Sequence, residues 1–503
     1  IHLVLMNDYG LSWDFHYHLY AGLYHLGLPV PSISEPSPVP FTPPDPRLTF
    51  ADPFGPFTQI IPALSYVLFY QKWHIFPPDS AYNFPIIMFG SLGVGVLFFF
   101  LLELFNFPIA FFGSLFLALT PNYFGYLHNN MKDIPNAFAF TLAVYLFWRL
   151  AHLRRVKDLI FAVLSFAFAF NVKINSVFVP VVCFLWYGVA YWKERKRYLI
   201  LLYFLLAPVA ALFLWLPFWE HPVKKLLELP FFYSHNTLGM PVLFFGDIVR
   251  SGVNIPWMYP YVYIAITTPL PILVSALFGI GISVYEVVRK KDKKYLILLM
   301  WFFVPLLRYF SPKASAIDGV RHFMEVVYPL AGFAAVGWVF LSRFVYKKAG
   351  KARLKAGQGI ILFHIIVFLF LIKNLVVYHP YQTSFFNSLI GGIRGASDKF
   401  DIDFWGSPQK EAVLWLNKNA PKDASVYIVM AQSSASVYAR EDLLKKINTK
   451  DMFTSDYTVV LNKQSFFSMY PVEKYMKEKI RKKQLVYQRT IEDVPLVWVF
   501  KNE

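Results

Sequence analysis

The chain has little cysteine and few charged residues for its size. One of its 503 residues is cysteine, Cys183, so no disulfide bond can form within the chain. Charged residues make up 16% of the sequence, whereas 56% are hydrophobic and 19% are aromatic. A soluble domain cannot cover so much apolar surface, and the composition therefore predicts an integral membrane protein.

Acidic residues are scarce relative to basic ones. Asp and Glu number 31 against 48 Lys and Arg, which gives a formal net charge of +17. Such an excess is one sign of nucleic-acid binding, but here the basic residues fall in short runs between apolar segments. That distribution is typical of the cytoplasmic loops of membrane proteins, so we expect no nucleic-acid partner.

Long apolar segments predict an α-helical polytopic membrane domain over residues 1–378. The opening IHLVLM is too short to span a bilayer and is interpreted as the tail of a preceding helix, for about 11 helices in all. The predicted spans within the chain are 84–105, 107–126, 136–151, 159–170, 175–192, 198–219, 261–288, 295–310, 323–345 and 360–377.

The basic runs orient these spans. The runs at 154–157, 193–197, 289–294 and 343–355 are each separated from the next by two spans, and we expect them to be cytoplasmic. Alternate loops then face outward, namely 7–83, 128–135, 171–173, 220–260, 311–322 and the tail from 379. This places Asp14, Asp133, Lys173 and Arg321 on one side, as a single outward-facing active site requires.

The outer region 7–83 contains the first candidate residue. We expect a surface helix over 14–27, a Pro-rich loop over 29–56 and a surface or re-entrant helix over 57–73. Asp14 begins the first of these helices, at the membrane surface, where a carboxylate can take a proton from an acceptor hydroxyl. The alternative is that Asp8 and Asp14 are solvated loop and helix-cap acids.

Charged residues near apolar spans need partners. A buried ammonium costs about 2.5 to 3.5 kcal/mol at mid-membrane, so Lys173 requires a partner or a water-filled cavity unless it snorkels to the surface. Arg308 and Glu325 lie in adjacent predicted spans and are expected to pair. Asp133 has a structural alternative, in which HNNMKDIP caps the next span with Pro135 in its first turn.

The sequence after the last span predicts a small extracytoplasmic α/β domain over 379–503. A helix is predicted at 411–418 and short strands at 425–430, 457–461 and 496–500. We expect the segment 403–405 at its beginning to close over the active site and help to choose the acceptor.

Five segments resemble a known family. NDYGLSWDFHYH, HNNMKDIP, NVKINS, GVRHF and HPYQTSFFNSLIGGIRGASDKFDIDFWG are similar to motifs of the prokaryotic protein-mannosyltransferase-like branch of the GT-C glycosyltransferases. That branch is related to the dolichyl-phosphate-mannose protein mannosyltransferases and the lipid A aminoarabinose transferase. The resemblance runs from Asn7 to Trp405 in the family's order. One departure is Phe15, which follows Asp14 where the family usually has Glu.

The resemblance implies an activity and a set of partners. Family members move one sugar, usually with inversion, from a polyprenyl-phosphate carrier to an acceptor on the extracytoplasmic face of the membrane. For this chain it implies the prokaryotic plasma membrane, a polyprenyl-phosphate-linked sugar donor, contact with membrane lipid, and an acceptor that is a protein, a lipid or a glycan. An inverting transfer needs one base and cationic help for the departing phosphate.

The resemblance also implies roles for individual residues. Asp14 is the expected general base, or the group that orients the acceptor. Asp133, with Lys132 and Asn130, forms a second acidic motif that binds the donor sugar, holds a metal ion or positions Lys132. The expected phosphate ligands are Arg321, His322 and Lys173, and the expected acceptor contacts are Asp8, His16, His18 and Trp405. The cofactor to test is a divalent metal ion, with Asp133 and His128 as candidate ligands and His16, His18 and His322 as further ones.

Two other functions compete with glycosyl transfer. A transporter or flippase of a lipid-linked sugar also binds an anionic lipid, but it is expected to show internal repeats and charges at mid-membrane, and neither is clear in the sequence. A scaffold for cell-wall assembly is the other alternative, with Phe15 as the mark of a lapsed active site.

Overall fold

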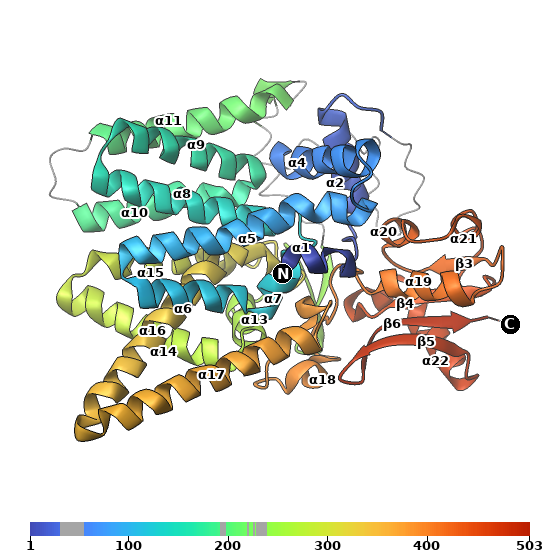
Figure 1. Ribbon diagram of the computed structural model, residues 1–503. Helices are drawn as coiled ribbons and strands as arrows, with labels where there is room; N and C mark the ends of the chain where they lie inside the picture. Colours follow the sequence, from blue (N-terminus) through green and yellow to red (C-terminus); the bar gives the residue numbers. More distant parts are fainter. Residues whose placement is uncertain (31–54, 192–197, 219–220, 225–226, 228–238, 503) are drawn as a thin grey trace.

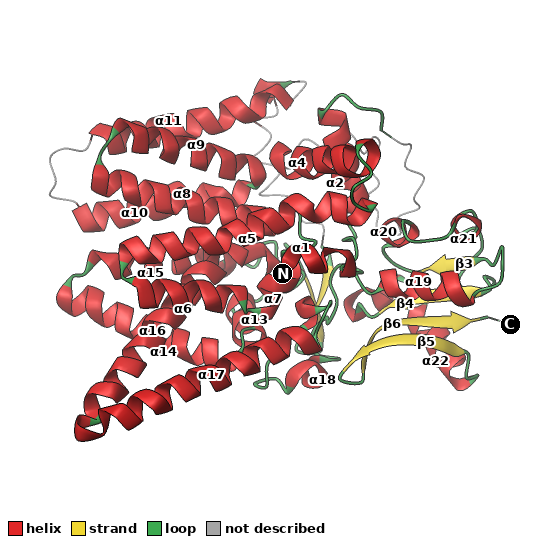
Figure 2. Ribbon diagram, viewed as in Figure 1, coloured by secondary structure: helices red, strands yellow, loops and turns green. Residues whose placement is uncertain are grey.

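Helices cover most of the chain in the computed structural model, which describes residues 1–30, 55–191, 198–218, 221–224, 227 and 239–502 (Figure 2). Seven of the described helices are long and apolar enough to cross a membrane. They are α5 (Pro78–Leu104), α8 (Asp133–Leu153), α10 with its first turn (Ile174–Tyr191), α11 with its last turn (Tyr198–Phe218), α14 (Leu270–Lys290), α16 with its first turns (Arg321–Lys348) and α17 with its first turn (Gly350–Val377). The chain is an integral membrane protein.

Shorter helices complete the bundle and correct two predicted spans. These helices are α6 (Phe107–Ala118), α7 (Pro121–Tyr126), α9 (Val156–Val172), α13 (Tyr259–Thr267) and α15 (Lys293–Leu306). The predicted span 107–126 is two helices, α6 and α7, and the predicted span 261–288 is also two, α13 and α14. Pro121 opens α7 and Pro269 precedes α14. Proline has no N–H to donate inside a helix and is tolerated at a helix start, so each break follows from the sequence.

The region before α5 is helical where it is described. It contains α1 (His2–Leu5), the turn η1 (Met6–Asp8), α2 (Phe15–His25), α4 (Pro56–Tyr66) and the π-helix η2 (Val67–Lys72). The helices predicted at 14–27 and 57–73 are thus present, and α2 packs directly against α4. The predicted Pro-rich loop falls almost entirely on 31–54, outside the described residues, as does the basic run 193–197.

The two ends of the bundle differ in composition. Figure 1 shows the turns that join α14 to α15 and α16 to α17 at the end of the bundle away from the C-terminal sheet. These turns carry the basic residues 289–294 and 343–355. The starts of α2 and α8 lie at the opposite end, beside the C-terminal part of the chain (Figure 1).

The C-terminal part forms a small mixed domain around a four-stranded sheet. The strands are β3 (Val426–Ile428), β4 (Tyr457–Leu461), β5 (Leu485–Ile491) and β6 (Val494–Lys501), in the order β3-β4-β6-β5. β3 and β4 are parallel and the other pairs are antiparallel. The helical elements are η8 (Gln382–Ser384), α18 (Gly392–Ala396), α19 (Gln409–Asn419), α20 (Gln432–Ser436), α21 (Glu441–Leu444), η9 (Gln464–Met469) and α22 (Val472–Arg481).

The predicted helix and three predicted strands of this domain are present, but β5 was not predicted. β5 is an edge strand whose side chains are mostly exposed or half-buried, so its sequence LVYQRTI lacks a clear apolar run. A hairpin of β1 (Pro241–Phe244) and β2 (Asp247–Arg250) lies outside this sheet. The predicted boundary between residues 378 and 379 stays a prediction.

Helices α14 and α16 pack at close range because glycine faces backbone on both sides. A Cβ atom at Gly279 would lie 1.8 Å from the Phe333 carbonyl oxygen, and one at Gly337 would lie 2.0 Å from the Ser275 carbonyl oxygen. Neither contact leaves room for a methyl group. Small residues allow this approach between membrane helices, where association depends on van der Waals packing.

We expect Gly279→Ala to destabilise the bundle by about 1 to 3 kcal/mol, because the new methyl group forces α14 and α16 apart. Gly281→Ala in the same helix is the matched control, since no heavy atom lies within 4 Å of its Cβ position. The measurement is unfolding of both variants in detergent micelles. Equal stability of the two variants would contradict the close packing.

Candidate active site

Charged side chains from four separate segments meet at the end of the bundle next to the C-terminal domain. They come from the residue before α2, the start of α8, the link between α9 and α10, and the start of the α16 segment. Two ion pairs carry most of the contacts, Lys132 with Asp14 and Lys173 with Asp133. Arg321 is close enough to act electrostatically on both carboxylates. The four residues predicted to share one face are therefore brought together.

Asp14 combines a low pKa with access to solvent. It directly precedes α2, and Lys132 Nζ donates to its Oδ2 at 3.0 Å. Burial by itself raises the pKa of the carboxyl, but the charges of Lys132 and Arg321 outweigh this, and the pKa lies well below its usual value. The side chain keeps 36% of its surface exposed. The carboxylate, which is charged at neutral pH, is therefore accessible to solvent.

Phe15 points away from this site. Its side chain is 2% exposed and its ring meets the Tyr82 ring of α5 edge-on at 4.7 Å. It also lies 6.4 Å from the Tyr66 ring of α4. Phe15 therefore fixes α2 against α4 and α5, while the Asp14 carboxylate remains paired with Lys132.

The second acidic motif forms a closed network at the start of α8. Asn130 Oδ1 accepts from the Asp133 N–H at 2.8 Å and from the Lys132 N–H at 3.2 Å. Asn130 Nδ2 in turn donates to Asp133 Oδ2 at 2.9 Å. The capping group is thus the Asn130 amide, which leaves the Asp133 carboxylate for Lys173. The partner that Lys173 requires between its apolar flanks is Asp133.

Arg321 is buried and held from two sides. Its Nε lies 3.2 Å from Asp318 Oδ2, and its guanidinium lies 4.8 Å from the centre of the Trp405 ring. Trp405 also accepts the Trp13 N–H at 2.9 Å through its carbonyl oxygen. The segment 403–405 predicted to lie over the site is therefore in contact with both Arg321 and the Asp14 loop. The expected Arg308 and Glu325 pair is also present, at 3.5 Å.

Near Asp14, His16 Nδ1 is buried without a hydrogen-bond partner among the described residues. So are Ser12 Oγ, two residues before Asp14, and Trp405 Nε1. An unpaired buried donor costs free energy comparable to a lost hydrogen bond. Hydroxyl groups of a bound molecule are suitable partners for Ser12 Oγ and Trp405 Nε1.

The histidines predicted to belong to the site lie in two separate parts of the structure: His16, His18 and His322 in one, and His128 in the other. His18 follows Asp14 by one turn of α2, and burial and then the Lys132 charge lower its pKa to about 3, so its imidazole is neutral. Burial lowers the pKa of the neighbouring His16 to about 4. The His322 carbonyl accepts from Asn175 Nδ2 at 3.2 Å, which ties the α16 segment to the start of α10.

His128 and Asp8 belong to a separate cluster. The His128 ring stacks on Tyr9 at 3.8 Å, and its Nδ1 donates to the Phe124 carbonyl at 2.8 Å. Asp8 accepts from His379 Nε2 at 2.9 Å. The structure therefore does not bring these two predicted site residues into contact with the Asp14 and Asp133 pairs.

The predicted metal ligands do not fit a metal ion. Both carboxylate oxygens of Asp133 are taken by Asn130 and Lys173, while His128 lies against Tyr9. Across the part of the chain that the structure describes, no group of three or more His, Cys, Asp or Glu is placed to hold a metal. No step of the proposed reaction is therefore assigned to a metal ion.

The sequence did not predict the contacts that the C-terminal domain makes with the rest of the chain near the site. Lys463 Nζ donates to Asp318 Oδ1 at 2.7 Å, and Lys410 Nζ donates to Asp79 Oδ2 at 2.7 Å. Asn129 Nδ2 donates to Ser407 Oγ at 2.9 Å. No local pattern marks these residues, because each pairs with a residue far away in the sequence.

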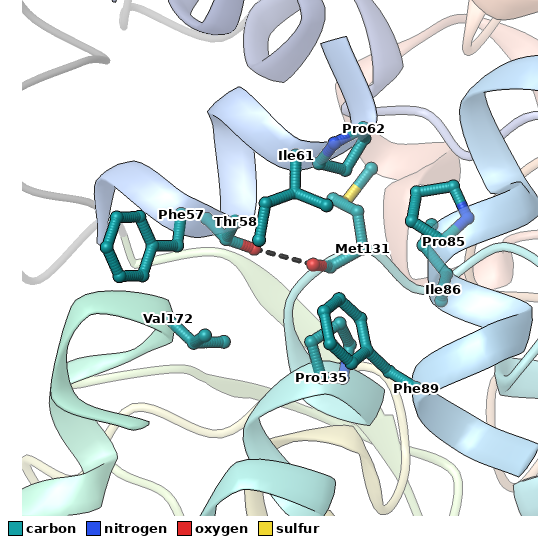
Figure 3. A pocket seen from close by; sticks show the side chains of 10 residues that line it. All are labelled: Phe57, Thr58, Ile61, Pro62, Pro85, Ile86, Phe89, Met131, Pro135 and Val172. Carbon is teal, nitrogen blue, oxygen red and sulfur yellow. Dashed lines mark hydrogen bonds between the residues drawn. The ribbon is translucent and has the colours of Figure 1, made fainter. Parts of the chain in front are cut away.

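An apolar pocket adjoins the acidic motif. Figure 3 shows side chains of α4 facing those of α5, with Met131 between them and Pro135 and Val172 on a further side of the pocket. These three residues are close neighbours of Lys132, Asp133 and Lys173 in the sequence. The side chains around this pocket are closely packed and leave no space for a water molecule. The Thr58 hydroxyl donates to the Met131 carbonyl at 2.5 Å.

The fold matches that of two membrane glycosyltransferases of known structure. ArnT from Cupriavidus metallidurans matches in the apo state with a TM-score of 0.53 and 12% identity, over 99% of this chain and 95% of ArnT. ArnT bound to undecaprenyl phosphate gives 0.52 and 12%, with the same coverage. The archaeal oligosaccharyltransferase AglB from Archaeoglobus fulgidus, in complex with an inhibitory peptide and a dolichol-phosphate, gives 0.50 and 11%, over 89% of this chain. The chain has the GT-C fold.

The matches cover different shares of this chain and of the related proteins. A model of the dolichyl-phosphate-mannose-protein mannosyltransferase family matches residues 60–218, less than half of the chain. This match includes Lys132, Asp133 and Lys173 of the charged cluster but neither Asp14 nor Arg321. The chain spans 66% and 61% of the length of the Archaeoglobus oligosaccharyltransferase in two of its structures. No curated protein sequence matches the chain.

We expect Asp403 to give the protein a measurable pH dependence of stability. Burial raises the pKa of Asp403 to about 6, although the Gly406 N–H donates to it. The folded chain therefore binds this proton more tightly than the unfolded chain, whose Asp pKa is about 3.9. The stability that protonated Asp403 contributes is present at low pH and falls, by up to about 3 kcal/mol, as pH rises from about 4 to 6.

The measurement compares thermal unfolding of the wild type and Asp403→Asn between pH 4 and 7.5. The wild type should lose stability relative to the variant as pH rises, and the exposed Asp423→Asn should follow the wild type at every pH. A wild-type minus Asp403→Asn difference that is constant with pH would be inconsistent with a raised pKa.

Proposed function

We propose that the protein is an inverting glycosyltransferase that moves one sugar from a polyprenyl-phosphate carrier to an acceptor hydroxyl on the extracytoplasmic face. The observation that carries the proposal is the Asp14 carboxylate, partly exposed and set among Lys132, Arg321 and the Asp133–Lys173 pair, next to an apolar pocket. Such a site offers one base, several cations for a phosphate and an apolar surface for a lipid chain.

Asp14 is assigned to the acceptor. Its carboxylate accepts the proton of the acceptor hydroxyl while the hydroxyl oxygen forms a bond to the anomeric carbon of the sugar. The bond between that carbon and the phosphate oxygen breaks at the same time, and its electron pair leaves with the phosphate. Attack from the face opposite the phosphate inverts the anomeric configuration.

The ion pair with Lys132 regulates the basicity of Asp14. A carboxylate with a strongly lowered pKa is a weak base, because efficient proton transfer needs a pKa near the working pH. A donor phosphate that attracts Lys132 removes the nearest cation from Asp14 and raises the pKa of its carboxyl. Donor binding therefore activates the base.

Phosphate binding is assigned to Arg321 and Lys173, with Lys132 between them and Asp14. Arginine and lysine neutralise phosphate through charge-assisted hydrogen bonds, which are strong where water is scarce. The His322 carbonyl accepts from Asn175 Nδ2 and so links the residue after Arg321 to the segment that follows Lys173. The carrier class is supported by the undecaprenyl phosphate of the ArnT structure and the dolichol-phosphate of the AglB structure.

The lipid chain is assigned to the closely packed apolar pocket between α4 and α5, whose side chains must separate to admit it (Figure 3). Its lining is almost wholly apolar, and it begins at the residues next to Lys132 and Lys173. Ser12 Oγ and Trp405 Nε1 are assigned to hydroxyl groups of the sugar or the acceptor, which supply the hydrogen-bond partners these atoms lack. Acceptors to assay are proteins, lipids and glycans.

We expect Asp14→Asn to lower sugar transfer about 10²- to 10⁴-fold, the usual contribution of a general base. The assay follows transfer from a panel of radiolabelled polyprenyl-phosphate sugars to a native membrane extract by purified protein in detergent. Asp8→Asn is the matched control, because Asp8 lies seven residues before the start of α2 and pairs with His379, whereas Asp14 pairs with Lys132.

Asp8→Asn should retain the wild-type rate. Full transfer by a folded Asp14→Asn variant would remove Asp14 from the role of base. Movement of the lipid-linked sugar across the membrane without transfer to any acceptor would favour a flippase and contradict the proposed function.

A further inference from the structure

The C-terminal domain places a buried lysine against the candidate phosphate site. Lys463 follows β4 and is 3% exposed. Its Nζ donates to Asp318 Oδ1 at 2.7 Å, and the other oxygen of Asp318 lies 3.2 Å from Arg321 Nε. One carboxylate from the loop before the α16 segment is therefore shared by two cations, one from each domain.

The surroundings of Lys463 contain no other direct ion-pair partner among the described residues. Its ammonium lies 4.8 Å from the Phe466 ring and 5.7 Å from the Phe404 ring. Asp401 and Asp403 act on it electrostatically, but both are engaged by backbone N–H groups, Asp401 by Leu243 and Ser465 and Asp403 by Trp405 and Gly406.

Lys463 remains charged in spite of its burial. Burial by itself lowers the pKa of the ammonium, but Asp318, Asp401 and Asp403 offset this, and the pKa lies above its usual value. A buried charge is tolerated where a partner compensates it. The Asp318 carboxylate is the partner in contact.

The charge balance decides how strongly Arg321 can bind an anion. Within the group in direct contact, Lys463 and Arg321 share the Asp318 carboxylate, so these three residues carry one net positive charge. Asp401 and Asp403 act on Lys463 from a greater distance. Without Lys463, the Asp318 carboxylate would compensate Arg321 alone, and the group would carry no net charge. Arg321 would then attract a phosphate less, because the ligand competes with Asp318 for the same guanidinium.

We propose that Lys463 is a positioning residue for donor binding, which acts by occupying Asp318 and so keeps the charge of Arg321 available to the phosphate of a polyprenyl carrier. This inference rests on the proposed function, since it assigns a phosphate to Arg321. It makes the C-terminal domain part of the donor site, because that domain supplies Lys463 and the neighbouring Trp405.

The test uses undecaprenyl phosphate as the probe and measures its affinity for the full-length protein in nanodiscs. Lys463→Met should weaken binding about tenfold, because the site loses its net positive charge. The double variant Lys463→Met/Asp318→Asn restores that net charge and should bind within about twofold of the wild type. A purely structural role of Lys463 predicts a double variant at least as impaired as the single one.

Two controls isolate the phosphate and the site. Lys479→Met removes another buried lysine of the same domain, 5.5 Å from the Tyr475 ring, and should leave the affinity unchanged. Undecaprenol, which has no phosphate, should bind equally to all variants. Displacement of the lipid by inorganic phosphate at equal concentration would identify free phosphate as the ligand and overturn the assignment to a lipid.

Failure of this inference is distinct from failure of the proposed function. Wild-type affinity in Lys463→Met, or a double variant as weak as the single one, would overturn the role of Lys463 even if Asp14→Asn abolishes sugar transfer. If Lys463→Met does not fold, Asp318→Asn decides the question. It leaves both cations without their carboxylate and should bind at least as tightly as the wild type, so weaker binding would overturn the inference.

Discussion

Compensation of charge in an apolar protein is the constraint on which the site depends. A chain with few charged residues places several of them together at one end of its helical bundle, where each needs an opposite charge from another segment. Lys132 meets Asp14, Lys173 meets Asp133, and Arg321 meets Asp318. Each pair fixes one segment against another, so the same contacts that allow the charges to be buried also build the site.

The ion pairs differ in how much of each carboxylate they leave exposed to solvent. Asp133 is closed by Asn130 and Lys173, while Asp14 keeps a third of its side chain exposed. Of the two acids, Asp14 is therefore the more accessible to solvent, and the network of Asp133 positions Lys132 and Lys173. An aromatic residue at position 15 is compatible with the proposed role of Asp14, since Phe15 packs inward against Tyr82.

The C-terminal domain does more than cover this end of the bundle. Lys410 donates to the carbonyl oxygens of Asn7 and Tyr9 as well as to Asp79, and thereby fixes the loop that leads to Asp14. Tyr438 accepts the Leu11 N–H at 2.9 Å in the same loop. The loop is held mainly by residues that follow it by about four hundred positions in the chain, and its shape depends on the folded C-terminal domain.

How far the sequence predicts this structure depends on whether the signal is local. Apolar runs predict the long helices, and alternation of loops predicts that Asp14, Asp133, Lys173 and Arg321 share one face. The breaks at Pro121 and Pro269 are also local, although they were not predicted. The ion pairs are not local: Lys132 and Asp14 lie 118 residues apart, and Lys463 and Asp318 lie 145 apart. No periodicity or spacing encodes such pairs, because tertiary packing alone brings them together.

The most direct test of the central claim is a cryo-electron microscopy structure of the protein in nanodiscs with undecaprenyl phosphate. The account predicts phosphate density within hydrogen-bond distance, about 3.2 Å, of Arg321, Lys173 or Lys132, with the lipid chain at the pocket between α4 and α5. A phosphate bound at the basic turn between α16 and α17 instead, with the Lys132 and Asp14 pair unaltered, would contradict it.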